Sequence, residues 1–194
     1  DVELERGSSL LVLARFRDEL PNRVTLHVTP SGEKPETTPF EKSLDDPVFG
    51  ARLPRVVSNL EYVVEYDQHR SRSFQVTVFD LPALVRSDLV VRQPDYTGKP
   101  EETLENAYDV TVVEGSEVTV ICRVNKPLAS AALTRKAGES IPLSRDPQDP
   151  LKWTVALSPQ QSERLFLELV DDRGRKNRDP DQFRINVVPN KPPT

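Results

Sequence analysis

Apolar residues recur at every second position in short runs along the whole chain, and this pattern limits the fold more than any other feature. The runs lie at residues 10–16, 24–28, 60–66, 74–78, 118–124, 165–169 and 183–187. A period of two places alternate side chains on opposite faces of a strand, so each run predicts a strand with one buried face. No segment holds a helical period for three turns; the nearest helix candidates are residues 101–107 and one turn at 160–164. The chain is therefore predicted to be all-β.

Prolines separate these runs. The 194 residues include 18 prolines and only 7 glycines. Proline interrupts helices and central strands but is accepted in turns, at strand starts and on sheet edges. Short strands joined by turns at intervals of about 8 to 12 residues predict a sandwich or a barrel.

The chain also repeats itself. Residues 1–16 align with residues 109–124 at an offset of 108, with six identical positions that include Gly7-Ser8 and Gly115-Ser116. Any two β-sandwiches share the alternation of apolar residues at every second position. The Gly-Ser pair at the same aligned position in both segments favours a duplication. Later strands of the two repeats align at offsets of 103 and 109 instead of 108. Changes in the length of the loops between strands are enough to explain the different offsets.

The repeat predicts the domain boundaries. We expect a first sandwich at 1–80, a linker at 81–87, a second sandwich at 88–188, and the start of a linker to a further module at 189–194. Residues 88–108 have no counterpart in the first repeat, whose first strand is therefore expected to be truncated. The chain reads as part of a tandem array.

Charge and hydropathy exclude two classes of partner. The formal net charge is -5, from 26 basic and 31 acidic side chains, without a basic excess in either half. A binder of nucleic acid or of an anionic membrane normally has such an excess. The longest apolar run, residues 10–14, is far shorter than the roughly 20 residues that span a bilayer. We expect no nucleic-acid partner and no membrane insertion by this segment.

Few residues are suited to catalysis or metal binding. Cys122 is the only cysteine. It is either a small buried hydrophobic residue or a reactive thiol. The apolar residues that alternate with it along the strand favour the buried hydrophobic residue. His27 and His69 lack a second histidine at ligand spacing and are expected to be solvated. No nucleophile-elbow motif and no glycine-rich phosphate loop is present. Adjacent acids such as Asp171-Asp172 are expected to be turn residues. We expect a protein that is not an enzyme, without a metal or cofactor.

One loop carries candidate binding residues. Residues 171–179 include Arg173, Arg175, Lys176 and Arg178 between acidic side chains. This composition is compatible with contact to an anion or acidic glycan, or with a solvated hairpin loop whose charges cancel. The same loop offers carboxylates for calcium but lacks the spacing of a calcium-binding loop.

The early strand that opens with Gly-Ser, and the late strand Leu60-x-Tyr62-x-Val64, resemble immunoglobulin-like folds. The early position that holds a disulfide cysteine in that family is occupied by Cys122 here and by Ala14 in the first repeat. The late position holds Val64 and Leu167, so the pattern is similar to bacterial immunoglobulin-like and fibronectin-type modules, which need no disulfide.

A second resemblance concerns the larger protein context. The segment 94–100, followed by Val113-Glu114-Gly115-Ser116, resembles a recurrent module start in very long bacterial envelope-associated proteins. The resemblance implies two tandem immunoglobulin-like antiparallel β-sandwiches outside the cytoplasm, in the periplasm, on the cell surface or secreted. Their role would be a spacer or a protein-binding segment. Their partners would be neighbouring modules of the same chain and, beyond these, protein or glycan.

Two alternatives remain open. The first is a carbohydrate-binding accessory module of a secreted hydrolase, for which Trp153 and Tyr96 are the candidate aromatic contacts. Exposure of Trp153 would favour this hypothesis and its burial would weaken it. The second is an enzyme with a site in the sandwich cleft, where His27 or His69 would need a carboxylate within hydrogen-bond reach.

Overall fold

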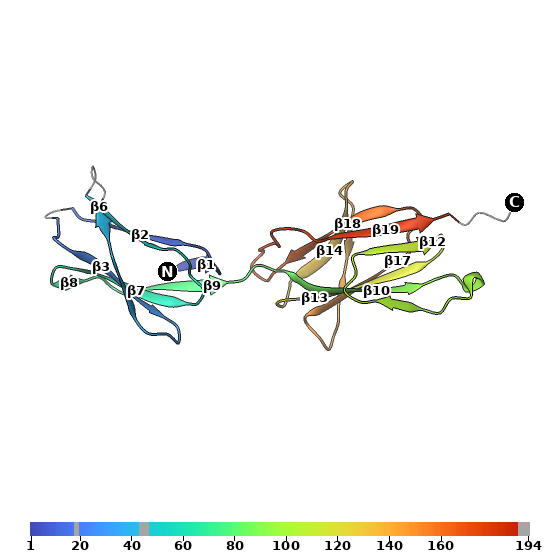
Figure 1. The fold of residues 1–194 in the computed structure, drawn as a ribbon, viewed down its shortest axis with the longest axis horizontal. Coiled ribbons are helices and arrows are strands. Elements are labelled where there is room, and N and C mark those ends of the chain that lie inside the picture. Colours follow the sequence, from blue (N-terminus) through green and yellow to red (C-terminus); the bar gives the residue numbers. More distant parts are fainter. Residues whose placement is uncertain (18–19, 43–46, 190–194) are drawn as a thin grey trace. The chain divides into compact units, whose positions relative to one another are not determined.

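The computed structural model describes residues 1–17, 20–42 and 47–189, and almost all of its regular structure is β. The chain divides into two compact units, Asp1–Asp80 and Leu81–Thr194, called unit 1 and unit 2 below (Figure 1). The predicted all-β fold class is confirmed.

Unit 1 is built from two sheets. Its strands are β1 (Val2–Glu5), β2 (Leu10–Arg15), β3 (Val24–Pro30), β4 (Glu36–Pro39), β5 (Glu41–Lys42), β6 (Val48–Leu53), β7 (Leu60–Tyr66), β8 (His69–Arg70) and β9 (Phe74–Phe79). One sheet has the order β1-β9-β7-β3-β4, with β8 paired to β7, and the other has the order β2-β6-β5.

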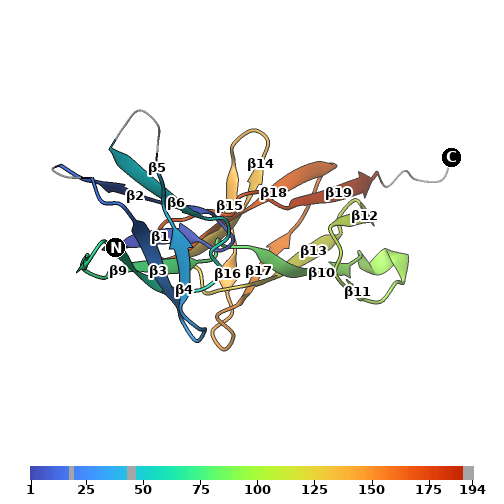
Figure 2. The same ribbon diagram turned by 60° about the vertical axis from the view of Figure 1, so that its left-hand side comes forward.

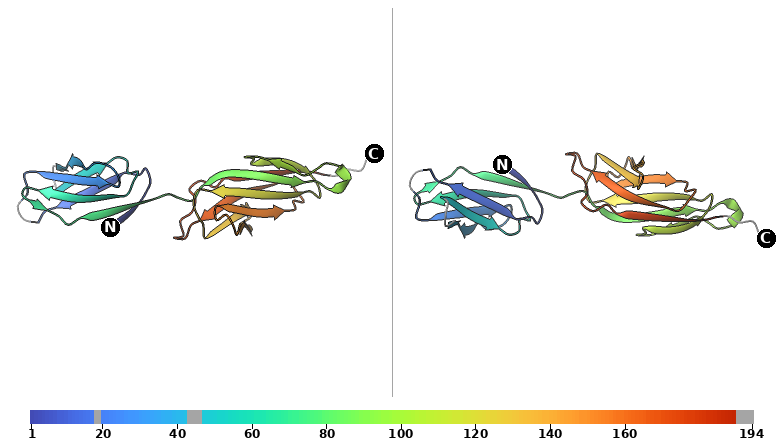
Figure 3. Two further views of the ribbon diagram at one scale, coloured as in Figure 1. Left: turned by 90° about the horizontal axis from the view of Figure 1, so that it is seen from below. Right: turned by 90° about the horizontal axis from the view of Figure 1, so that it is seen from above.

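Unit 2 has the same two-layer plan, and Figure 3 shows the strand layers of each unit from two sides. Its elements are β10 (Leu84–Arg92), the 3-10 helix η1 (Asp95–Thr97), β11 (Glu102–Leu104), β12 (Asp109–Val113), β13 (Glu117–Val124), β14 (Ser130–Arg135), β15 (Ser140–Pro142), β16 (Ser144–Arg145), β17 (Lys152–Leu157), β18 (Glu163–Val170) and β19 (Gln182–Val188). The sheet orders are β11-β10-β13-β17-β16 and β12-β19-β18-β14-β15.

The strand order is that of an immunoglobulin sandwich. When β10, β13, β14, β16, β17, β18 and β19 are taken as strands A to G, one sheet reads A-B-E-D and the other G-F-C. Unit 1 repeats the order B-E-D and G-F-C, and its described residues, 1–17, 20–42 and 47–80, form no strand A. Pairing is antiparallel as expected, except that β1 lies parallel to β9 and β12 parallel to β19 (Figure 2).

The turns that precede β2 and β13 have the same geometry in both units. Gly7 and Gly115 have φ angles of +86° and +87°, a left-handed conformation that favours glycine. The residue after each glycine donates its N–H to the carbonyl of Glu5 or Val113, the last residue of the preceding strand, at 3.0 and 3.1 Å. The aligned Gly-Ser pairs therefore have equivalent roles.

Alanine at either glycine tests this equivalence. We expect Gly7→Ala to destabilise unit 1 and Gly115→Ala to destabilise unit 2, each by roughly 1–2 kcal/mol, because a Cβ disfavours the left-handed conformation. The effect should be larger at position 115, where the new Cβ would lie 3.4 Å from Pro94 Cγ, whereas nothing lies within 4 Å at position 7.

Denaturant unfolding followed unit by unit measures the effect, and Gly50→Ala is the control. Gly50 lies on β6 outside the left-handed region, and its added Cβ would make only an ordinary contact with Leu13. A neutral result at Gly7 and Gly115 would show that the turns do not require the left-handed conformation.

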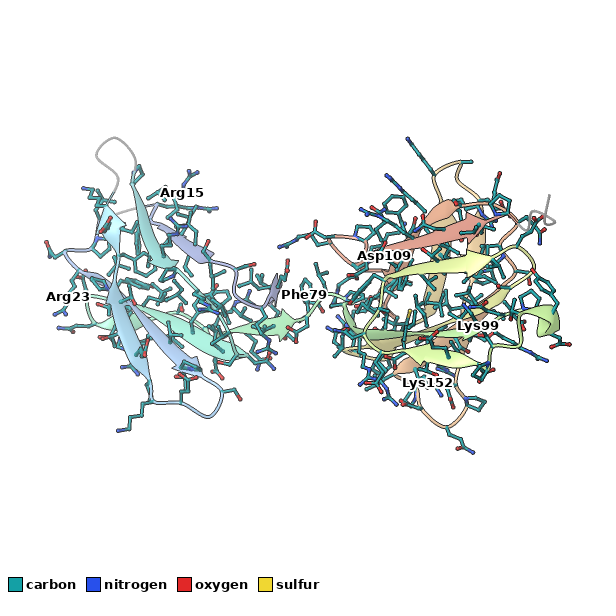
Figure 4. All side chains as sticks on the ribbon, turned by 45° about the vertical axis from the view of Figure 1, so that its right-hand side comes forward. Arg15, Arg23, Phe79, Lys99, Asp109 and Lys152 are labelled. Atoms are coloured by element: carbon teal, nitrogen blue, oxygen red, sulfur yellow. The ribbon has the colours of Figure 1, made fainter. Side chains whose placement is uncertain are left out.

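Each unit buries its own hydrophobic cluster between its two sheets, and Figure 4 shows the side chains that fill this space. In both clusters a small side chain on one strand lies opposite a large aromatic side chain on the neighbouring strand. Ala14 on β2 lies opposite Phe49 on β6, and Cys122 on β13 lies opposite Trp153 on β17. A small residue opposite a large aromatic fills the core at nearly constant volume, as close packing requires.

Several sequence predictions need correction. The helix candidate at 101–107 contains strand β11, because Leu104 pairs with Leu89 on β10 and Asn106 has a φ of +46°. Residues 160–164 contain no helix, and Glu163 begins β18.

The boundary between the units also differs from the predicted linker. Residues 84–87 belong to β10, whose Ser87 lies opposite Cys122. Only a few residues therefore separate β9 from β10. The linker predicted at 189–194 lies outside the described residues except for Pro189. Within the described ranges, no helix has the length and hydropathy needed to cross a membrane.

Candidate functional site

A buried carboxylate organises the 171–179 loop, which joins β18 to β19. The side chain of Asp171 is fully buried. Its Oδ1 accepts hydrogen bonds from the backbone N–H groups of Arg173, at 3.0 Å, and Arg175, at 2.9 Å. Its Oδ2 accepts a hydrogen bond from Lys126 Nζ at 2.8 Å. The loop therefore folds around one acidic side chain.

These contacts determine the protonation of Asp171. Burial by itself raises the pKa of a carboxyl group, because it disfavours the charged form. The hydrogen bond from Lys126 and the two backbone N–H groups act in the opposite direction and prevail, so the pKa of Asp171 is lowered. The carboxylate is ionised at neutral pH and holds the start of the loop.

Two of the predicted basic residues of this loop lie close to acidic side chains. Arg175 Nη1 lies 3.7 Å from Asp171 Oδ2, and Lys176 Nζ lies 3.5 Å from Glu168 Oε2. Arg173 contributes its backbone N–H to the carboxylate. These internal ion pairs are those expected of a loop whose charges cancel. An anion or acidic-glycan contact through Arg173, Arg175, Lys176 and Arg178 stays a prediction.

The two aromatic candidates have different environments. Trp153 is only 5% exposed, and its indole Nε1 has no hydrogen-bond partner in the described part of the chain. The burial of Trp153 weakens the prediction that it is an aromatic contact, because its side chain faces the core across from Cys122. Tyr96, on η1, is 62% exposed, and its hydroxyl donates to the carbonyl oxygen of Glu114 at 3.4 Å. Tyr96 is therefore the only one of the two aromatic candidates that is exposed.

Both histidines lie in unit 1, His27 at the middle of the β3–β7 ladder and His69 on β8. His27 Nε2 lies 3.3 Å from Glu65 Oε2, and Arg70 Nε donates to the same oxygen at 2.8 Å. That hydrogen bond lowers the pKa of Glu65, which makes its carboxylate a weaker base. His69 stacks on Tyr66 with ring centroids 5.5 Å apart. His27 therefore has a carboxylate within reach, but its Nε2 makes no hydrogen bond within the described residues, and Arg70 occupies the carboxylate oxygen.

No metal centre emerges from the described residues. Among residues 1–17, 20–42 and 47–189, no three His, Cys, Asp or Glu side chains form a group that could hold a metal ion. Asp181, just beyond the 171–179 loop, has a raised pKa caused chiefly by its partial burial.

Cys122 is a buried core residue, as the alternation predicts. Burial raises its pKa to about 12, so the thiolate, which is the reactive form, is scarce at neutral pH. We expect a thiol reagent such as Ellman's reagent to modify the folded chain at least roughly a hundredfold more slowly than the urea-unfolded chain. Equal rates in both states would contradict the burial.

The strand order defines this chain as a tandem immunoglobulin-like β-sandwich protein. No protein-family model matches the sequence, and no curated protein matches it. Among solved structures, a crystal structure of the I9-I11 tandem from titin is similar, with a TM-score of 0.35 and 9% sequence identity. The match covers 97% of this chain and 63% of the titin chain, so this chain spans less than two thirds of that tandem. The immunoglobulin-like assignment rests on the sheet orders described above.

Proposed function

We propose that the chain is a non-enzymatic pair of immunoglobulin-like modules that acts as a spacer or a protein-binding segment in a multidomain extracytoplasmic protein. The observation that carries this proposal is the repetition of one sandwich, each copy with its own core. A module that buries its core without its neighbour can be added in series, which is the requirement for a spacer.

The junction between the units supports the spacer role. Asp80, the last residue of unit 1, accepts hydrogen bonds from Arg6 Nε and Nη2 at 2.8 and 3.1 Å. On the other side, Asn125 Oδ1 accepts the N–H of Ala83, and Asn125 Nδ2 donates to the carbonyl of Leu81, both at 2.9 Å. The chain is thus fastened to unit 1 up to Asp80 and to unit 2 from Leu81 onward. Few backbone torsions are left to bend, and Pro82 restricts them further.

A distance measurement across the junction tests the spacer role. Spin labels on Glu33→Cys and Ala137→Cys, both exposed loop positions, report the inter-unit distance by double electron–electron resonance. We expect a narrow distribution for the unmodified junction. A chain with an eight-residue Gly-Ser insert between Asp80 and Leu81 is the flexible control. A distribution as broad as that of the control would contradict the spacer role.

Asn125→Ala provides a graded variant of the same experiment. It removes two hydrogen bonds from the junction while leaving the backbone bond from Asn125 N to Ala83 O at 3.1 Å. We expect a broader distance distribution and a loss of about 1 kcal/mol in the stability of unit 2. An unchanged distribution would show that Asn125 does not restrict the junction.

The extracytoplasmic location is part of the proposal and has its own test. Its support is the resemblance of segment 94–100 to envelope-associated modules. We expect fractionation of the source cells to recover the protein with the envelope or the medium. Recovery with the cytosol would contradict this location.

A further inference from the structure

Strand β2 of unit 1 has an open edge that its counterpart in unit 2 does not have. In unit 2, β13 pairs with β17 on one side and with β10 on the other. In unit 1, β2 pairs with β6 and ends its sheet within the described residues. Because β2 and β13 align at an offset of 108 residues, the open edge lies where β10 is bound in unit 2.

The core of unit 1 is incompletely covered at this edge. Leu10 and Ala14, which point inward from β2, are only half-buried, whereas their counterparts Val118 and Cys122 on β13 are fully buried. In unit 2 the cover includes Leu89 of β10, which is itself fully buried. The missing strand thus corresponds to missing hydrophobic burial as well as missing backbone pairing.

The outer face of β2 is also apolar. Leu11 and Leu13 are 59% and 62% exposed, and they line a shallow groove beside Gly50 on β6. An edge strand with an exposed apolar surface favours pairing with a further strand. Residues 10–14 carry no charge and no proline, and the only charged residue of β2 is Arg15 at its end.

The other sheet-end strands are protected against such pairing. Each is at most five residues long and contains a charged residue or a proline, whereas β2 has six residues. The protected strands in the described part of the chain are β1, β4, β5, β11, β12, β15 and β16. Short length, charge and proline are the devices by which natural edges resist added strands. The edge of β2 differs from these strands because it is longer and because residues 10–14 carry no charge and no proline.

We propose that the open edge of β2 is a docking edge that receives an antiparallel strand with aliphatic side chains at alternate positions, supplied by polypeptide outside residues 1–194. This proposal rests on the interaction role proposed above and specifies its surface. Strand addition of this kind gains affinity from backbone hydrogen bonds and specificity from the alternate side chains.

The pairing in unit 2 supplies the register and the chemistry of the occupant. Ser87, Leu89 and Val91 of β10 lie opposite Cys122, Val120 and Val118. Transferred by 108 residues, these positions fall on Ala14, Val12 and Leu10. The docked strand therefore places a small side chain opposite Ala14 and aliphatic side chains opposite the other two. Its neighbouring outward residue, equivalent to Val90, lies beside Leu11.

Copying residues 81–108 in front of Asp1 tests the proposal in the full chain. Asp1 aligns with Asp109, so the copy delivers a β10-like strand to β2 with the connection length found in unit 2. We expect the β2 amides that do not donate to β6 to exchange with deuterium at least tenfold more slowly than in the parent chain. The matched control carries Leu89→Lys and Val91→Lys in the copied segment only, and should show no slowing.

Each outcome decides the matter. A folded graft whose β2 amides exchange as fast as the parent overturns the proposal. If unit 1 of the graft does not fold, as judged by the amide resonances of residues 24–28, a synthetic peptide of residues 83–93 is titrated into the parent chain. Saturable shifts at residues 10–15 then support the proposal, and their absence overturns it.

A second copy is the competing occupant. A parent-chain dimer in analytical ultracentrifugation that Leu11→Lys dissociates would overturn the proposal in favour of self-association. A broad distance distribution in the spin-label experiment would contradict the spacer role but not the docking edge. Fast exchange of the β2 amides in the folded graft would contradict the docking edge but not the spacer role.

Discussion

Leu167→Ala is expected to destabilise unit 2 by about 3 kcal/mol and to leave the unfolding of unit 1 unchanged. Leu167 lies on β18, is fully buried, and faces Leu133 of β14, which is also fully buried. Removing its side chain costs both the lost hydrophobic burial and the cavity that remains, because neighbouring strands relax only in part. The separate clusters predict that this cost stays within one unit.

The chain contains a built-in reporter for this experiment. Trp153 is the only tryptophan and belongs to the unit 2 core, so its fluorescence follows the unfolding of unit 2. Amide resonances of residues 24–28 follow unit 1. Val85→Ala, at an exposed position of β10, is the matched control and should change stability by less than about 0.5 kcal/mol. Equal destabilisation of both units by Leu167→Ala would mean that they share one cooperative core.

Asp171→Ala is expected to cost unit 2 about 3 kcal/mol at neutral pH. The substitution removes the carboxylate that Lys126 contacts at 2.8 Å and deprives two backbone N–H groups of their acceptor. Removing one member of a buried charged pair is costly because the remaining groups were desolvated together with it. Asp172→Ala, the exposed neighbouring carboxylate, is the control and should be nearly neutral.

The same carboxylate gives the stability of unit 2 a defined pH dependence. The pKa of Asp171 is lower in the folded chain than in the unfolded chain, so in acid the unfolded state binds the proton more readily. Its contribution is fully present above the unfolded pKa of about 4 and is lost as the pH falls through the folded value. We expect the difference in unfolding free energy between the parent and Asp171→Asn to shrink from pH 7 toward pH 2–3. A difference that is constant with pH would contradict the ionised, buried state of Asp171.

The sequence was sufficient to predict the class of fold because the relevant signal is local. Period-two alternation marked the strands, and the Gly-Ser alignment marked equivalent turns with φ angles of +86° and +87°. Each of these features depends on residues close together in the chain. The segment 101–107 was misread because its short stretch lacks alternation, and its conformation is set by pairing with β10.

The candidate site was harder to predict because it depends on contacts distant in sequence. Asp171 and Asp172 look equivalent in the sequence, yet one is buried and the other exposed. The difference comes from Lys126, which lies 45 residues earlier in the chain. Trp153 could not be assigned to the core or the surface until its opposite residue, Cys122, was known.

The open edge of β2 was predicted only in part. The apolar run at residues 10–14 has the composition of an interior strand, and the lack of a counterpart to residues 88–108 predicted that unit 1 is missing its first strand. The comparison of β2 with β13 shows which edge this leaves open, since β13 is bound on both sides. Edges are properties of a sheet, and a sheet is assembled from distant segments.

The most direct test of the repeated sandwich is an NMR measurement of cross-strand nuclear Overhauser effects at the two parallel pairings. The account predicts that β1 lies parallel to β9, with Val2 beside Val76, and that β12 lies parallel to β19, with Val110 beside Ile185. Antiparallel Hα–Hα contacts at either pairing, or a parallel pairing in one unit only, would contradict the claim that one fold occurs twice.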